Sequence, residues 1–267
     1  MKSKSTLPVI SREYKVMLDP RLFDNAREGL EEVKADLKRQ AKRFDAKVSG
    51  RFDKFDQRTI RFLDTPDFSF RNNQLILRHR RPKGSSSDGE FTLKCRSEDR
   101  YLAAAADLRP AKKLNGKFKF EEDIAAPFRS RFSHSVTIAS PTDGLPETVA
   151  KASRLFPLLG KLPRDGGRCE GKTPVLGVND FVPHEQVRKG LKLTLTPDVD
   201  CSVAVILWSH TSKGRILCAE FSFRYRDKKE QYPAAAAQTA YDLFAAIQKL
   251  DWCHPNGVSK TQFAYQG

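Results

Sequence analysis

Short runs in which apolar and charged residues alternate constrain the fold of this chain most strongly. In segment 74–81, Leu75 and Leu77 share one parity while Arg78 and Arg80 share the other. Successive side chains of a strand point to opposite faces, so such a run predicts a strand with one apolar and one charged face. The same alternation recurs in segments 12–18, 91–96, 117–124 and 219–226.

Two arrangements satisfy this pattern. An antiparallel sheet can pack its apolar face on helices and turn its charged face to solvent. The charged parity here, however, mixes Glu with Arg and Lys on strand after strand. That mixture is typical of a closed barrel whose interior binds a highly charged ligand together with a counter-metal. We therefore predict an α+β fold, an antiparallel closed barrel with a charged interior and helices packed on its outside.

Two longer segments predict the covering helices. Apolar residues recur at three- and four-residue steps over 22–44, and a second amphipathic segment spans 234–250. A stretch with many prolines lies between, where only a helix near 146–159 is predicted. Strands with one apolar and one charged face are predicted on both sides of this stretch. We therefore expect one domain over residues 1–267 with an elaborated middle region around 97–174.

The composition indicates which kinds of partner the protein binds and in which cellular compartment it is found. The chain carries 48 Lys and Arg against 33 Asp and Glu, a formal net charge of +15, which favours a polyanionic partner. Its longest apolar run, 203–208, is far short of the ~20 residues of a membrane-spanning helix. Five scattered cysteines without a C-x-x-C pair fit a reducing cytoplasm. Arginines without neighbouring stacking aromatics argue against nucleic acid.

One motif match is rejected on context. Residues 166–173, GGRCEGKT, fit the pattern G-x-x-x-x-G-K-T, whose phosphate-cradling loop requires a strand before it and a helix directly after it. Here Pro163 precedes the motif and Pro174 follows it. We expect no nucleotide-binding loop at this position.

The ordered motifs resemble the CYTH superfamily, the triphosphate tunnel metalloenzymes. Segment 62–67, FLDTPD, with NNQLILRHRR after it, is similar to the family's Y-F-D-T-P-D segment and L-x-x-R-x-R strand. Segments 91–94 (FTLK), 119–121 (KFE) and 219–222 (AEFS) are similar to its T-L-K, R-x-E and E-x-E elements, and 259–260 to its terminal S-K. The resemblance implies an eight-stranded antiparallel tunnel.

The resemblance also implies a site. In that family, inward Arg and Lys grip a triphosphate and inward carboxylates hold Mg²⁺ or Mn²⁺. Carried over to this sequence, the phosphate-binding residues are Lys15, Arg78, Arg80, Lys94, Arg96, Lys119 and Arg188. The metal ligands are Glu13, Glu121 and Glu220. No catalytic residue is assigned.

The sequence departs from the family at two carboxylate positions. Ser11 and Ser222 stand where the family has Glu, which weakens the expected metal site. Two functions therefore remain open. The leading one is metal-dependent hydrolysis of inorganic, nucleoside or thiamine triphosphate. The alternative is a non-catalytic module that binds nucleotide or polyphosphate. Both imply a small-molecule triphosphate or polyphosphate partner and no membrane, and a homodimer is left open.

Overall fold

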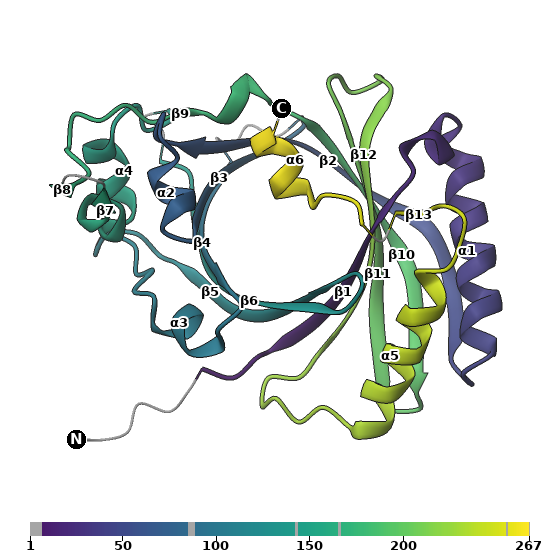
Figure 1. The fold of residues 1–267 in the computed structure, drawn as a ribbon. Helices are drawn as coiled ribbons and strands as arrows, with labels where there is room; N and C mark the ends of the chain where they lie inside the picture. Colours follow the sequence, from purple (N-terminus) through teal and green to yellow (C-terminus); the bar gives the residue numbers. More distant parts are fainter. Residues whose placement is uncertain (1–6, 85–88, 142–143, 165–166, 255, 267) are drawn as a thin grey trace.

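The computed structural model describes residues 7–84, 89–141, 144–164, 167–254 and 256–266. Its centre is a closed ring of strands, seen end-on in Figure 1. Around the ring the order is β10–β11–β12–β1–β5–β6–β4–β3–β2, and β2 pairs with β10 to close it. The bounds are β1 Ser11–Leu18, β2 Lys47–Asp64, β3 Leu75–Pro82, β4 Glu90–Ser97, β5 Lys117–Ala125, β6 Arg129–Ala139, β10 His184–Thr196, β11 Val199–Ser209 and β12 Ile216–Arg226.

The predicted α+β class and closed strand structure are confirmed, with two corrections. The described ring has nine strands rather than eight. It is also not wholly antiparallel, because β1 and β5 pair in parallel, with Ser11 opposite Glu121 and Glu13 opposite Asp123. A parallel pair requires a crossover connection, and here the chain between β1 and β5 supplies β2, β3 and β4.

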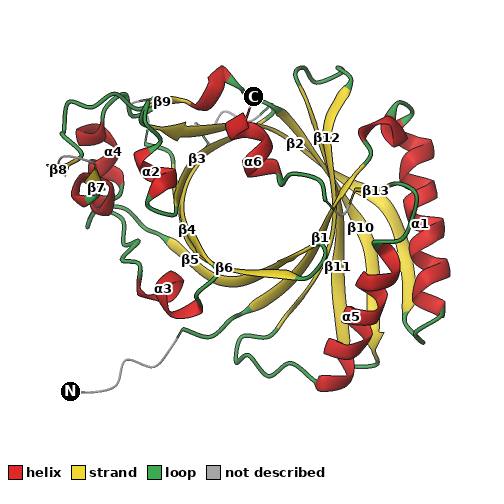
Figure 2. Cartoon of the chain, in the orientation of Figure 1, coloured by secondary structure: helices red, strands yellow, loops and turns green. Residues whose placement is uncertain are grey.

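Helices lie around the ring (Figure 2). The helices are α1 Ala26–Lys42, α2 Ser69–Asn72, α3 Arg100–Ala105, α4 Val149–Leu155, α5 Ala234–Ile247 and α6 Lys260–Gln266. The helix predicted over 22–44 begins later, because Pro20–Phe23 forms a separate 3-10 turn and the Asn25 side chain caps α1 by accepting from the backbone N–H of Arg27. Short strands β7 Pro163–Arg164, β8 Gly167–Arg168, β9 Leu176–Gly177 and β13 Cys253–His254 complete the described elements.

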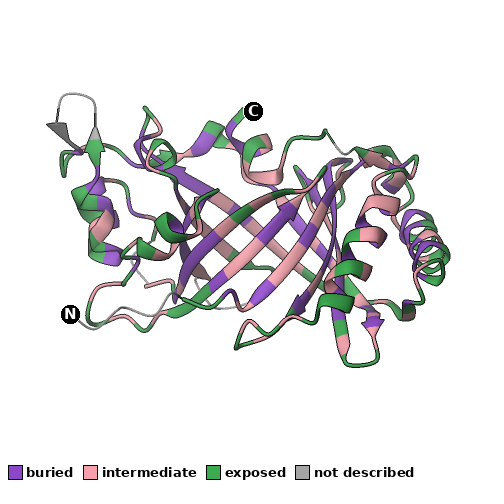
Figure 3. Ribbon diagram, turned by 60° about the horizontal axis from the view of Figure 1, so that its bottom comes forward, coloured by how far each residue is buried: buried purple, intermediate pink, exposed green. Residues whose placement is uncertain are grey.

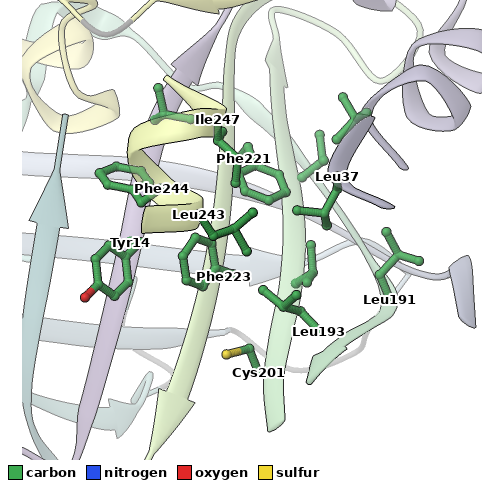
Figure 4. Packing of buried hydrophobic residues seen from close by; sticks show 14 of the residues in the cluster. Tyr14, Leu37, Leu191, Leu193, Cys201, Phe221, Phe223, Leu243, Phe244 and Ile247 are labelled. Atoms are coloured by element: carbon green, nitrogen blue, oxygen red, sulfur yellow. The ribbon is translucent and has the colours of Figure 1, made fainter. Parts of the chain in front are cut away.

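The largest core lies outside the ring, between its wall and helices α1 and α5 (Figure 4). The apolar parity of β1 and β12 points into it. Tyr14 stacks on Phe223 with ring centroids 4.9 Å apart and meets Phe244 of α5 edge-on at 5.2 Å. Leu37 of α1 joins the same core. Because this apolar face is buried outside the ring, the charged side chains at the alternate positions of the same strands point toward the interior. Figure 3 shows the resulting mixture of buried and half-buried residues along the strands.

The middle region adds ring strands as well as a cover. It supplies β5 and β6, while α4 and the 3-10 turn Pro157–Lys161 occupy the segment in which one helix was predicted. Their apolar residues, Phe156 among them, pack in a second core with Leu77 and Leu93. After Thr173 the described chain enters no helix before the 3-10 turn Val178–Asp180. Gly166, the first residue of the rejected motif, lies outside the described residues.

A bulge in β10 reverses the faces of that strand. The register with β11 shifts by one residue between Lys189 and Lys192, next to Gly190, whose φ of +116° favours glycine. Before the bulge Glu185 lies opposite Trp208, and after it Leu191 packs in the outer core. The reversal explains how one strand can line the ring interior at one end and pack in the outer core against α5 at the other.

Helix α6 lies over the opening of the ring (Figure 1). Ala264 and Tyr265 pack there with Phe62, Trp208 and Cys218. The hydroxyl of Tyr265 donates to a carboxylate oxygen of buried Asp64 at 2.9 Å. An apolar cluster therefore lies at this end of the ring, beneath the last described helix. In the described part of the chain no helix is long and apolar enough to cross a membrane.

Candidate functional site

Charged side chains from most of the ring strands converge on the interior. The cations come from β1, β2, β3, β4, β12 and α6, and the carboxylates from β1, β5, β10 and β12. The cations are Lys15, Arg58, Arg78, Arg80, Lys94, Arg96, Arg224 and Lys260, and the carboxylates are Glu13, Glu121, Asp123, Glu185 and Glu220. Because the cations outnumber the carboxylates, this wall is suited to an anion.

The first of two charge clusters is centred on Asp123. Its carboxylate lies 2.7 Å from Nζ of Lys15, 3.0 Å from a guanidinium nitrogen of Arg96 and 3.8 Å from Nζ of Lys94. The hydroxyl of Ser133 donates to it at 2.9 Å. Burial alone would raise the pKa of Asp123, but Lys15, Lys94 and Arg96 together hold that pKa well below its usual range. Asp123 is therefore an anion at every physiological pH.

Glu13 and Lys15 extend this cluster along β1. Nζ of Lys15 lies 3.1 Å from Oε2 of Glu13. Burial opposes the charged form of both groups, yet the attraction between them, with Asp123 and Glu220 acting on the lysine, raises the pKa of Lys15 and lowers that of Glu13. Residues two apart on one strand thus form an ion pair inside the ring, which the alternation in the sequence makes possible.

The second cluster is centred on Glu185 of β10, whose side chain is 3% exposed. Arg58 of β2 forms an ion pair with it, and the indole nitrogen of Trp208 donates to it at 2.8 Å. Nζ of Lys260 lies 4.0 Å from Glu185 and 3.0 Å from Glu220. Burial would raise the pKa of Glu185, but Lys260 and Arg58 lower it to about 2.

Between the clusters, cations on β3 and β4 have weak carboxylate partners. Arg78 forms no ion pair with any described residue, Arg80 lies 3.4 Å from the half-exposed Glu90, and Lys94 reaches Asp123 only at 3.8 Å. Burial and neighbouring cations lower the pKa of all three, that of Lys94 to about 7. Nε of Arg80 is buried and has no hydrogen-bond partner among the described residues. This face of the interior therefore has hydrogen-bonding capacity that the described chain does not use.

A small cavity opens in front of this cationic face. Its lining comprises Phe62, Ile76, Arg78, Thr92, Lys94, Arg96 and Thr261. Three of the seven predicted phosphate-binding residues therefore border one space, and Thr261 brings α6 to its edge. The cavity combines guanidinium and ammonium donors with two threonine hydroxyl groups, and phosphate oxygens accept hydrogen bonds from all three kinds of donor.

Two predicted phosphate-binding residues lie away from this space. The guanidinium of Arg188 stacks on the ring of Phe55, 3.7 Å from its centroid, and donates to Gln186. Arg188 is thus on the opposite face of β10 from Glu185. Lys119 is near the exposed start of β5 and forms no ion pair within the described chain. The other five, Lys15, Arg78, Arg80, Lys94 and Arg96, line the interior.

The predicted metal ligands all lie on the interior wall but do not converge. Glu121 accepts from the hydroxyl of Ser11 at 2.8 Å and lies 3.6 Å from Arg224, Glu13 pairs with Lys15, and Glu220 pairs with Lys260. Among the described residues no group of three His, Cys, Asp or Glu side chains could hold a metal ion. As arranged, these carboxylates fit the ammonium and guanidinium groups of this chain and do not fit a divalent ion held by the protein alone.

Several interior residues were absent from the sequence-based site. Asp123 shares the charged parity of Glu121 in the segment 117–124, and that parity was the available signal. Lys260 lies in the 259–260 pair that carried part of the family resemblance. For Arg58, Glu185 and Arg224 the only available signal was their position in the alternation of apolar and charged residues along a strand. In β10 the bulge at Gly190 interrupts that alternation.

The fold and site together define a protein built on a closed strand ring with a charged interior. The sequence matches no protein-family model. No curated protein matches it significantly. Among solved structures, HpAC1 from Hippeastrum superposes with a TM-score of 0.50 at 10% identity, over 97% of this chain and 96% of that one. HpAC1 is described as a candidate adenylyl cyclase that reveals a dominant triphosphatase activity.

A candidate adenylate cyclase from Bacillus halodurans is also similar, with a TM-score of 0.39 at 11% identity over 96% of this chain and 97% of the other. The HpAC1 match confirms the fold expected from the CYTH resemblance. At 10% identity the agreement concerns the fold, and the chemistry must be argued from the residues of this chain.

Proposed function

We propose that the ring interior binds the phosphate chain of a triphosphate-containing small molecule and that the protein hydrolyses its terminal phosphate. The observation that carries this proposal is the set Arg78, Arg80 and Lys94, three buried cations on adjacent strands that have weak or no carboxylate partners in the part of the chain that the structure describes. Buried unpaired cations are costly. A bound polyanion would offset that cost and satisfy the buried Nε of Arg80.

The same residues suit the chemistry of phosphoryl transfer. The transferred phosphoryl group spreads negative charge over its equatorial oxygens, and fixed cations stabilise that charge without reorganisation. Guanidinium groups of Arg78 and Arg80 can each donate two parallel hydrogen bonds to a phosphate, while Lys94 acts as a point charge. The activity described for HpAC1, a protein of the same fold, supports hydrolysis over binding alone.

A non-catalytic polyphosphate-binding module is the second candidate. It is favoured by the pairing of every predicted metal ligand with a group of this chain and by Ser11 at a position where the CYTH resemblance implies Glu. Dependence on Mg²⁺ or Mn²⁺ remains a prediction from the resemblance. Phosphate release assayed with each ion and with EDTA tests that dependence directly.

The decisive experiment compares two arginines. Phosphate release and calorimetric binding are measured for tripolyphosphate, ATP and thiamine triphosphate. Arg78→Gln should weaken binding about tenfold or more, because it removes a buried cation that faces the ligand. Arg188→Gln removes the same charge from the outer face of β10 and should change binding less than about twofold.

Each outcome of this comparison has a definite meaning. Binding that responds equally to both substitutions would reject the ring interior as the site. Tight binding to the wild-type protein without turnover, with every ion and with EDTA, would select the non-catalytic module. Absence of binding to all three compounds would reject both candidate functions.

A further inference from the structure

Asp123 places a negative charge among the cations proposed to bind phosphate. Three of the predicted phosphate-binding residues, Lys15, Lys94 and Arg96, surround its carboxylate at 2.7, 3.8 and 3.0 Å. Ser133 donates a further hydrogen bond at 2.9 Å. An anion of this chain therefore already occupies the point at which the cations of β1 and β4 converge.

This arrangement differs from that of the neighbouring arginine. Arg78 borders the cavity and has no ion pair within the described residues, so a phosphate that reaches it breaks no ion pair. A phosphate that reaches Lys15 or Arg96 must share these cations with Asp123 and is repelled by the carboxylate itself.

We propose that Asp123 is an internal counter-anion, which holds Lys15, Lys94 and Arg96 together in the free protein and competes with phosphate for them. This inference deepens the proposed function and rests on it. As a consequence, the Asp123 carboxylate raises the stability of the free protein and lowers its affinity for phosphate. A phosphate chain would then be held most firmly at Arg78 and Arg80, beyond the reach of Asp123.

A purely positioning role for Asp123 predicts the opposite sign. If the carboxylate only aligned the three cations for the ligand, its neutralisation would disperse them and weaken binding. If it competes, neutralisation releases them to the ligand and tightens binding. The direction of the change in affinity therefore distinguishes the two roles.

The test is isothermal titration of tripolyphosphate in EDTA at neutral pH, with Asp123→Asn and a matched control. Asp123→Asn keeps the shape of the side chain, and we expect binding about tenfold tighter together with a lower melting temperature of the free protein. The control is Glu122→Gln, the next residue of β5, which pairs with Arg12 at 2.6 Å on the outer face. It removes the same charge and should leave the affinity within about twofold.

A second variant covers the case in which Asp123→Asn does not fold. The double variant Arg96→Gln with Asp123→Asn removes one ion pair at constant net charge and leaves Lys15 paired with Glu13 at 3.1 Å. It should bind tripolyphosphate at least as tightly as the wild-type protein, although it has lost a cation. Binding that is weaker in either variant would overturn the inference.

Failure of the inference is separable from failure of the proposed function. If wild-type protein binds tripolyphosphate and Arg78→Gln weakens that binding, the proposed binding site stands whatever Asp123→Asn does. If wild-type protein does not bind, the proposed function itself is wrong.

Discussion

The ammonium nitrogen of Lys260, in α6, lies 3.0 Å from Oε1 of Glu220, in β12. This ion pair ties the last described helix to the charged interior of the ring, and both side chains are largely buried, at 16% and 8% exposure. The same ammonium group is 4.0 Å from Glu185 and lies over the ring of Trp208. One residue of α6 thus helps to neutralise two buried carboxylates.

We predict that Lys260→Gln lowers the free energy of unfolding by about 1–3 kcal/mol, because two buried carboxylates lose a cation. Urea denaturation at neutral pH measures the change. The exposed Lys249 is the control, and Lys249→Gln should alter stability by less than about 0.5 kcal/mol. Equal effects of the two substitutions would show that the pair with Glu220 contributes nothing to the fold.

Lys94 predicts a pH dependence of stability. Its pKa of about 7 in the folded protein lies below the ordinary value of 10.5. Between these values the unfolded chain binds more protons at this residue than the folded protein does, so the contribution of Lys94 to stability rises with pH. Wild-type protein should therefore gain stability relative to Lys94→Met between pH 7 and pH 9, as measured by urea denaturation of both. A parallel pH dependence of the two proteins would contradict the prediction.

The same residue predicts proton uptake on binding. A phosphate near Lys94 favours its charged form, so tripolyphosphate binding at pH 8 should draw a proton from the buffer. Titrations in two buffers of different ionisation enthalpy reveal this uptake as a difference in apparent binding enthalpy. Lys94→Met should abolish most of that difference.

We predict that removal of the Tyr265 hydroxyl lowers the free energy of unfolding slightly and loosens α6. This hydroxyl donates to Asp64, whose carboxylate also accepts from the backbone N–H groups of Thr65, Phe70 and Arg71. Tyr265→Phe should cost about 1 kcal/mol in unfolding free energy and speed amide hydrogen exchange in α6. Tyr241→Phe is the control, because Tyr241 is 49% exposed and its ring stacks on Phe128. A protected α6 in Tyr265→Phe would mean that apolar packing alone holds the helix.

We predict that replacement of Gly190 by alanine at the β10 bulge strongly destabilises the protein. A Cβ atom there would lie 2.3 Å from the backbone oxygen of Arg51, and the φ of +116° disfavours any other residue. Gly190→Ala should destabilise the protein by about 2 kcal/mol or more. Gly84 also has positive φ but has open space around it, so Gly84→Ala should cost about 1 kcal/mol. Urea denaturation of both variants separates the steric term from the backbone term.

Strand parity explains how much of the site could be predicted from the sequence. Arg78, Lys94 and Arg96 each follow a buried apolar residue, and Arg80 lies two residues after Arg78 on the same strand. This local pattern fixes their face once the apolar face is buried. Arg188 could not be placed in this way, because the parity of β10 reverses at Gly190. Its actual partner, the ring of Phe55, lies on β2, far away in the sequence.

The ring order and the ion pairs depend on contacts that no local pattern encodes. The parallel pairing of β1 with β5 requires that the chain cross from one to the other through β2, β3 and β4. The engagement of Glu13 and Glu220 by lysines follows from side-chain geometry within the assembled ring. Alternation predicted which side chains face inward, but not which of them neutralise each other.

The position of β1 also determines when the ring can form during synthesis. β1 begins at Ser11, yet one of its two long neighbours is β12, which ends at Arg226. A chain emerging from the ribosome must keep this early strand without its late neighbour until most of the polypeptide has been translated. We therefore expect closure of the ring to be a post-translational event, and nascent chains halted before β12 to need protection from aggregation.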